Sequence, residues 1–200
     1  MLSALTTARA GEDRLDPGEL IGLGYTLLGT GYDPTAGQIG NVALTLLTNH
    51  PALWHRLGTH PGEVPQAVRE PLRVVNLNAD DTSGLPRIAT EDVTVAGVRI
   101  PAGDAVFLSF ASANRDEAVF DAPEQADFHR SPEPHLAFGH GIHRYLDAGL
   151  ARLELAVVLE ELTNRFPHTQ LAVPEHELRR RAGDVNHNLL ALPVHLRRTT

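Results

Sequence analysis

The longest apolar segment of the chain, residues 17 to 49, constrains the fold most. Asp16-Pro17-Gly18-Glu19 is a typical helix start, with a capping aspartate, a proline in the first turn and a glutamate three residues after the aspartate. The segment is also rich in glycine and contains Pro34, which removes the helical hydrogen bond to the carbonyl oxygen of Thr30. Two interpretations are open: two helices broken at 31–34, or one helix kinked at Pro34 beside a ligand.

Hydrophobic spacing predicts further helices and a small β region. Pro51 starts a short helix, and longer helices are expected at about 64–75 and 147–165, the last with leucine and valine at helical spacing. Between them the pattern changes to alternation, and VTVAGVRI, a turn and AVFLSF predict strands at about 92–110. The tail LLALPVHL predicts a last strand or hairpin. The expected fold is mainly α with a small β region (α+β).

The composition excludes several classes of function. The 200 residues include 17 basic and 25 acidic side chains, a formal charge of −8, without a basic stripe, so nucleic acid is not an expected partner. The absence of cysteine excludes disulfides, thiolate nucleophiles and cysteine metal sites. MLSALTTARA lacks the basic start and long apolar run of a signal peptide, and no segment is long enough to span a membrane. We therefore expect a cytoplasmic protein without a membrane partner.

Four separated stretches follow one family pattern in the same order: TGYDPTAGQIGN, EPLR, PRIATEDVTVAGVRIPAGDAVFLSFASANRD and FGHGIHRYLDAGLARLE. Together they resemble the cytochrome P-450 superfamily of haem-thiolate monooxygenases, specifically the C-terminal half of the soluble bacterial type. The resemblance implies that residues 1–200 form a single partial P-450-like domain. Its parts are a distal helix at about 17–49, an E-x-x-R helix at about 64–75, a β region at about 92–110, a haem-loop-like segment at 135–147 and a last long helix at about 147–165.

The resemblance also implies roles for the glycine-rich loop. In the family this loop wraps the proximal face of haem, and a cysteine seven residues after the phenylalanine holds the iron. Counting from Phe138 leads to Tyr145, so the thiolate that favours O–O cleavage is missing. Arginine and histidine at the family's propionate positions suit those carboxylates. The implied haem-binding residues are Arg87, His135, Phe138, Gly139, Gly141, His143 and Tyr145.

The identity of an iron ligand is open. Tyrosine holds haem iron in catalases, which makes Tyr145 a candidate metal ligand, and His140 and His143 are alternatives at His-x-x-His spacing. A phenol reaches further than a thiol, so a loop built for cysteine would have to retreat or expel the porphyrin. No third ligand for a separate metal site is identifiable in the sequence.

The distal helix departs from the family pattern beside its acid. The family has an acid followed by a threonine, whose hydroxyl helps to deliver protons to bound oxygen. Here the acid is Asp33, the candidate catalytic residue, but the alcohol position is Pro34. Thr30 lies one turn back on the same face, and Thr35 is rotated by about 100° around the helix. Neither threonine stands where the family places its hydroxyl.

Two further positions differ from the family. The structural pair Glu70 and Arg73 normally meets an arginine from a loop, and Gln125 stands at the matching position. A neutral amide cannot replace a guanidinium in holding a buried carboxylate. Asp147 stands where the family has a glycine close to the porphyrin, and it is expected to cap the last long helix.

Three functions are compatible with these departures. The first is an auxiliary, protein-binding homologue in a biosynthetic pathway, without monooxygenase activity. Its partner would be a protein that covers the distal helix or a glycosyltransferase-like enzyme, since cysteine-less relatives activate glycosyltransferases. The second is a haem protein with altered axial ligation and oxidoreductase, peroxidase-like or rearrangement chemistry. The third is a non-functional truncated remnant, because family members are about twice as long. For a chain of this length we expect either a partly open half-domain or an intermolecular contact along residues 20 to 48.

Overall fold

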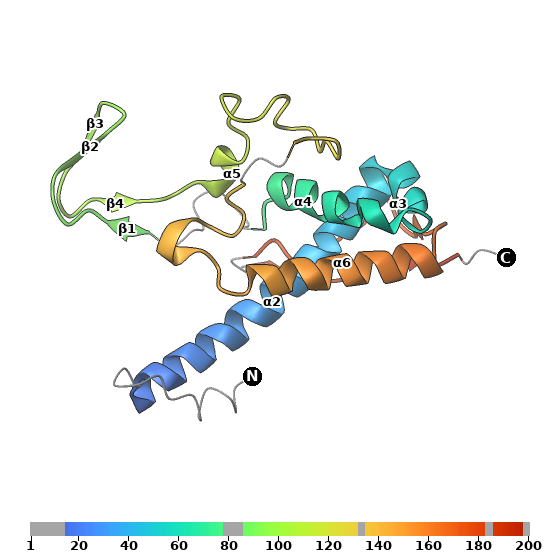
Figure 1. Ribbon diagram of the computed structural model, residues 1–200, viewed down its shortest axis with the longest axis horizontal. Coiled ribbons are helices and arrows are strands. Elements are labelled where there is room, and N and C mark those ends of the chain that lie inside the picture. The colour runs from blue at the N-terminus through green and yellow to red at the C-terminus, as the bar shows by residue number, and fades with distance from the viewer. Residues whose placement is uncertain (1–14, 78–85, 132–134, 183–185, 198–200) are drawn as a thin grey trace.

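The computed structural model describes residues 15–77, 86–131, 135–182 and 186–197. Its body consists of the helices α2 (Pro17–Asn49), α3 (Pro51–Leu57), α4 (Val64–Val74) and α6 (Ala148–Arg165), shown in Figure 1. Shorter helices are η1 (Pro61–Glu63), α5 (Phe110–Ala113), η2 (Gly141–His143) and η3 (Glu175–Glu177). The fold is mainly helical with small two-stranded sheets, as the sequence predicts.

The helix α2 is continuous and runs through Pro34. The interpretation as two helices broken at 31–34 is therefore wrong. The helix begins with a capping box, in which the Glu19 N–H donates to Asp16 Oδ1 at 2.8 Å and the Asp16 N–H donates to Glu19 Oε2 at 2.9 Å. Because proline has no N–H, the carbonyl oxygen of Thr30 has to find its donor outside the helix ladder.

The hydrophobic core forms where the second half of α2 meets α3, α4 and α6. Leu46 of α2 is 0% exposed, and the buried Trp54 of α3 donates its indole N–H to the carbonyl oxygen of Phe166 at 3.2 Å. The helices approach closely at Gly58, where a Cβ would lie 2.5 Å from the Thr163 carbonyl oxygen of α6. The core consists of Val42, Ala43, Leu46, Trp54, Leu57, Val64, Ala67, Val68, Leu72, Leu155 and Leu159.

The first half of α2 extends away from this core (Figure 1). Its buried side chain is Leu27, whereas the buried residues of the second half begin at Thr35 and continue to Leu46. The open face expected along residues 20 to 48 is therefore confined to the first half of the helix. No helix in the described ranges is long and apolar enough to cross a membrane.

The β region is divided into two antiparallel pairs. β1 (Arg87–Ile88) pairs with β4 (Ala105–Val106), and β2 (Val93–Val95) pairs with β3 (Val98–Ile100). The β2–β3 turn places Ala96 and Gly97 at positive φ, 47° and 81°, and the hairpin projects from the body in Figure 1. The strand expected across AVFLSF is wrong beyond Val106, because the Ser109 hydroxyl accepts the Ser112 N–H at 3.0 Å and starts α5.

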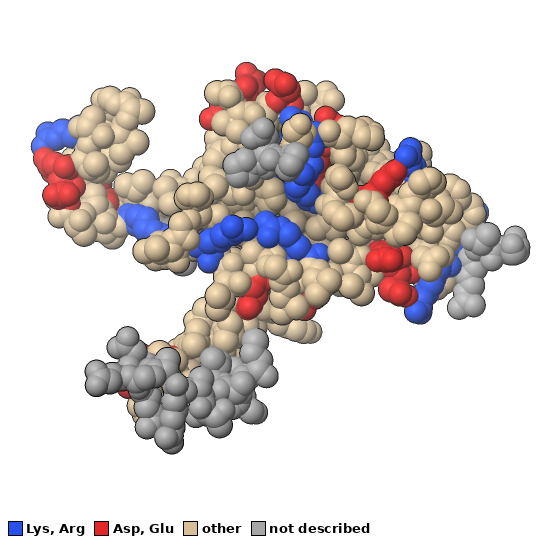
Figure 2. Space-filling model, viewed as in Figure 1, with Lys and Arg blue, Asp and Glu red and all other residues tan. Residues whose placement is uncertain are grey.

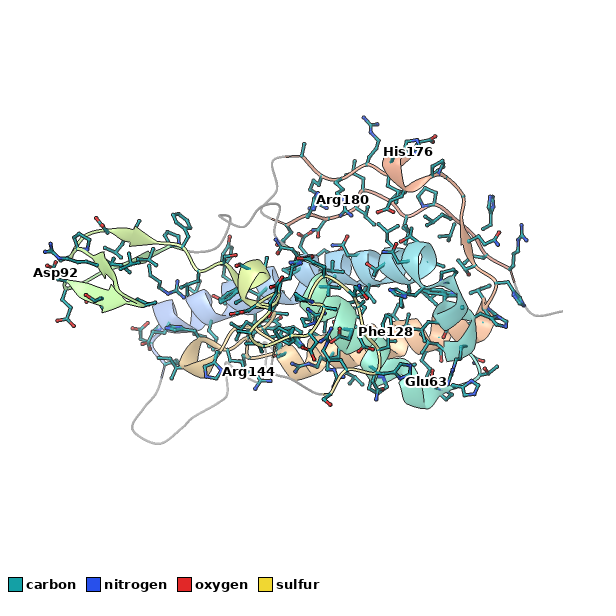
Figure 3. The ribbon with its side chains drawn as sticks, turned by 90° about the horizontal axis from the view of Figure 1, so that it is seen from above. Glu63, Asp92, Phe128, Arg144, His176 and Arg180 are labelled. Carbon is teal, nitrogen blue, oxygen red and sulfur yellow. The ribbon has the colours of Figure 1, made fainter. Side chains whose placement is uncertain are left out.

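The C-terminal segment returns along α2. β5 (Gln170–Leu171) pairs antiparallel with β6 (Val194–His195), so the predicted last strand is present. Between these strands, Arg180 Nη1 donates to Asn41 Oδ1 of α2 at 2.9 Å. Figure 3 shows Arg180 on a segment that runs beside the blue helix. The segment therefore covers the second half of α2 and reaches the neighbourhood of Asp33.

The start of α6 differs from the expected cap. Asp147 occupies the N-cap position, and its carbonyl oxygen accepts the Ala151 N–H at 2.9 Å. Its side chain makes no capping hydrogen bond within the described residues. The reason is its backbone, at φ −91° and ψ 20°, because a capping side chain needs an extended residue to reach the free N–H groups of the first turn.

Candidate functional site

The buried ion pair of α4 fixes the position of the loop that follows the β region. Glu70 and Arg73 are each 2% exposed, and Arg73 Nη2 lies 3.1 Å from Glu70 Oε2. The remaining donors of Arg73 reach three backbone carbonyl oxygens: Asn114 at 2.9 Å, Pro123 at 2.6 Å and Gln125 at 2.8 Å. Arg73 therefore satisfies a buried carboxylate and three loop carbonyls at once.

The third group at this ion pair is Arg130, not Gln125. Arg130 Nε lies 3.4 Å from Glu70 Oε2, and the Asp127 N–H donates to the same oxygen at 3.1 Å. Gln125 contributes its backbone carbonyl instead of its amide. Gln125 stands at the position that the resemblance implies, and the second cation at Glu70 is supplied by Arg130. Arg130 lies five residues further along the same loop, and nothing in the spacing of the motif indicates it.

The glycine-rich loop forms a tight turn that presents Tyr145. Gly139 and Gly141 have positive φ, 69° and 66°, a region that glycine adopts without strain. The Arg144 N–H donates to the carbonyl oxygen of Gly141 at 3.1 Å, and the Tyr145 N–H donates to that of Phe138 at 2.9 Å. The loop thus closes on itself between Phe138 and Tyr145.

The side chain of Tyr145 joins the loop to α2. Its hydroxyl donates to the carbonyl oxygen of Thr30 at 3.1 Å. This is the carbonyl that Pro34 leaves without a helical donor. The ring of Tyr145 stacks on Phe138, with centroids 6.1 Å apart and planes inclined by 14°, and the Arg152 guanidinium lies 4.6 Å from the Phe138 centroid. The position expected for the iron ligand is therefore occupied by a phenol bound to the distal helix.

His135 lies next to this stack as a neutral ring. Its centroid is 6.2 Å from that of Phe138, and its Nδ1 accepts the Ala137 N–H at 3.3 Å. Burial, together with the positive charge of Arg152, lowers the pKa of His135 to about 4. The structure thus brings His135, Phe138 and Tyr145 together.

The other two expected propionate ligands lie outside this stack. Arg87 is an exposed residue of β1, and His143 is exposed at the end of η2. Figure 3 places Arg144 directly after η2, and Figure 2 shows basic side chains gathered near the start of α6. Burial and the charge of Arg144 lower the pKa of Arg152. No cluster of three or more metal-ligating side chains occurs among the described residues, so His140 and His143 have no third partner there.

The distal acid is held by the C-terminal segment. Asp33 accepts hydrogen bonds from Arg181 Nη1 at 3.1 Å, Asn186 Nδ2 at 3.3 Å and Asn188 Nδ2 at 2.8 Å. Hydrogen bonding to Asn186 and the charge and hydrogen bond of Arg181 lower the pKa of Asp33. The carboxylate is therefore ionised and bound to side chains that the sequence motif does not indicate.

A surface hollow lies in a different part of the molecule. It has a volume of about 340 Å³ and is formed by α3, η1, the start of α4 and the loop at Phe128. Glu63 and Phe128, both labelled in Figure 3, belong to its wall. None of its lining residues belongs to the glycine-rich loop or to α2.

A family model described as cytochrome P-450 matches residues 64–184, which include the ion pair of α4 and the glycine-rich loop. The chain belongs to the cytochrome P-450 family. It is 43% identical over 194 residues to mycinamicin IV hydroxylase/epoxidase from Micromonospora griseorubida and 44% identical over 194 residues to nocardicin C N-oxygenase from Nocardia uniformis. Each match covers 97% of this chain and 48% of the relative, so the chain spans about half the length of these relatives.

Solved P-450 structures match to the same extent. A mutant of the mixed-function P-450 MycG in complex with mycinamicin V superposes with a TM-score of 0.89 at 43% identity, over 96% of this chain and 48% of that one. The P-450 hydroxylase of the leinamycin pathway of Streptomyces atroolivaceus gives a TM-score of 0.88 at 42% identity, over 96% of this chain and 49% of that one. The helical arrangement is therefore that of half a P-450.

The P-450 family binds haem, but the residues of this chain do not fit it. The chain has no cysteine, and the residue at the ligand position reaches α2 with its hydroxyl. A porphyrin needs open space between the glycine-rich loop and the distal helix, and here the Tyr145 side chain spans that space. A 3.1 Å contact between a side chain and the opposite backbone leaves no room for a flat group between them.

Proposed function

We propose that this chain is a protein-binding P-450 homologue of a biosynthetic pathway, without monooxygenase activity. The observation that carries the proposal is an apolar face on the first half of α2, here named the α2 stripe: Ile21, Tyr25, Leu28 and Tyr32. Their exposed fractions are 72%, 80%, 62% and 78%. Spacings of four, three and four residues place all of them on one side of the helix. In Figure 2 the visible surface of this arm is mostly uncharged.

A second apolar row strengthens the argument. Leu150, Leu153 and Val157 of α6 are 48%, 60% and 49% exposed and also recur at helical spacing. Fully burying one large apolar side chain contributes about 1.5–3 kcal/mol, so the exposed parts of the four residues of the α2 stripe represent about 4–9 kcal/mol. That value is comparable to the net stability of a whole domain, about 5–15 kcal/mol. Apolar faces of this extent are typical of protein interfaces.

The lack of monooxygenase activity is inferred from the ligand position. Thiolate ligation supplies the electron density that favours O–O cleavage in P-450 enzymes. A chain without cysteine cannot supply it, and Tyr145 is engaged with Thr30. The relatives are named as a hydroxylase/epoxidase and an oxygenase. This chain resembles about half of their length but has no cysteine to act as a thiolate ligand.

The partner that we infer is a polypeptide with a complementary apolar helical surface, equivalent to the part of the relatives that this chain does not span. The match to 48% of each relative supports this choice, because about half of each relative lies outside the match. A glycosyltransferase-like enzyme of the pathway is the alternative occupant, and the experiment distinguishes the two.

The test is coexpression of the chain with the unmatched half of mycinamicin IV hydroxylase/epoxidase, followed by size-exclusion chromatography with light scattering. We expect a one-to-one complex. Tyr25→Asp should weaken the complex more than tenfold, because it places a charge in the centre of the stripe. Val98→Asp is the matched control, since Val98 is 65% exposed on the distant β3 strand. The same chromatography is repeated with a glycosyltransferase of the pathway in place of the unmatched half. A complex that forms only with the glycosyltransferase and is weakened by Tyr25→Asp would favour that enzyme as the partner. No complex in either experiment would refute the proposal.

A further inference from the structure

Two unusual residues meet at one backbone carbonyl. Pro34 removes the amide that normally bonds to the carbonyl oxygen of Thr30, and the Tyr145 hydroxyl bonds to that same oxygen at 3.1 Å. The Thr30 hydroxyl does not compete for it, because it donates to the carbonyl oxygen of Thr26 at 2.8 Å. The released carbonyl of α2 is therefore satisfied by a side chain 115 positions further along the sequence.

The phenol is held from the loop side as well. The backbone N–H of Tyr145 donates to the carbonyl oxygen of Phe138, and its ring stacks on the Phe138 ring. The Arg152 guanidinium lies over the same Phe138 ring, 4.6 Å from its centroid. A tyrosine fixed at its backbone, its ring and its hydroxyl loses little further freedom when it bridges two elements. The contact is thus a defined bridge between the loop and α2.

We infer that Pro34 and Tyr145 are a matched pair that closes the haem slot from within. The proline presents a free carbonyl on the loop-facing side of α2, and the tyrosine fills the space and supplies the missing donor. Each residue makes the other tolerable: without the phenol the carbonyl loses its partner, and without the proline the phenol loses its acceptor. The pairing consists only of contacts inside this chain and needs no protein partner.

A double-mutant cycle in the full chain tests the pairing. Tyr145→Phe removes only the hydroxyl and is expected to raise the unfolding equilibrium constant about fivefold, the effect of one hydrogen bond. In the Pro34→Ala background the restored backbone amide bonds to the Thr30 carbonyl, so the same Tyr145→Phe change should alter the constant less than twofold. Equal effects of Tyr145→Phe in the two backgrounds, measured by urea unfolding, would overturn the inference.

Haemin titration tests the closed slot without unfolding the chain. With the slot closed, haemin should show no saturable change in its Soret absorption at one equivalent of the wild-type chain, and the melting temperature should stay unchanged. A stoichiometric complex of haemin with the wild-type chain would overturn the inference, whether or not Tyr145→Phe removes its absorption band. The two proposals fail independently, because unfolding and haemin titration are measured without a partner, whereas complex formation is measured on a chain that keeps both Pro34 and Tyr145.

Discussion

Replacing Arg73 by alanine is expected to unfold the chain. The guanidinium donates to Glu70 and to the carbonyl oxygens of Asn114, Pro123 and Gln125. Removing one partner of a buried ion pair costs about 3–5 kcal/mol. Each buried carbonyl left without a donor adds about 1 kcal/mol or more. The combined loss, about 6 kcal/mol, equals or exceeds the stability of a marginal domain, about 5 kcal/mol.

Arg130→Ala is the matched control for this experiment. Arg130 contacts the same Glu70 oxygen, but at 3.4 Å and with 10% of its side chain exposed, so its loss should cost about 1–2 kcal/mol. Urea unfolding can be followed by the fluorescence of Trp54, the single tryptophan, which is buried in the core. Arg73→Ala should lack a folded baseline, whereas Arg130→Ala should keep a cooperative transition. Similar small losses for the two variants would refute the reasoning.

Two other predictions concern acid stability and close packing. The pKa of His135 is lowered to about 4, below the unfolded value of about 6.5, so the unfolded chain takes up its proton first and stability should fall as the pH drops from 6.5 to 4. Allowing for the partial exposure of the ring to water, the free energy of unfolding should fall by about 2 kcal/mol over this pH range. Urea titrations at a series of pH values should show this dependence in the wild-type chain and a weaker dependence in His135→Leu. Gly58→Ala should cost about 2 kcal/mol, because its Cβ would lie 2.5 Å from the Thr163 carbonyl oxygen. Gly62→Ala, where a Cβ meets nothing within 4 Å, should keep the wild-type melting temperature, and equal melting temperatures for both glycine variants would contradict the packing argument.

Local signals are sufficient to predict the long helices. The capping residues Asp16 and Glu19 indicate the start of α2, and the observed helix has the bounds that the sequence predicts. Pro34 left two interpretations open, because the tolerance of a helix for proline depends on a donor that comes from elsewhere. That donor is Tyr145, and no local rule connects two residues so far apart in the chain.

The other features that the sequence does not predict also depend mainly on contacts between segments that are far apart in the chain. Arg130 reaches Glu70 because the loop after Phe120 folds back over α4, and its path is set by the three carbonyls that Arg73 holds. The side chains that bind Asp33 come from the C-terminal segment, which carries no motif of its own. Ser109 ends an alternating apolar run because its hydroxyl caps a helix, an effect that outweighs strand propensity there.

The unequal burial of α2 also affects its folding energetics. The helix has 33 residues and is about 50 Å long, but the core stabilises only its second half. The first half has several glycines, each of which costs about 1 kcal/mol relative to alanine. Helices with few tertiary contacts are marginal in water, and the contacts that hold this half include the buried Leu27 and the Tyr145–Thr30 hydrogen bond. A ligand that covers this half therefore supplies part of the free energy that keeps it helical. Its measured affinity will include a folding contribution, and it will carry the larger heat-capacity change that accompanies coupled folding and binding.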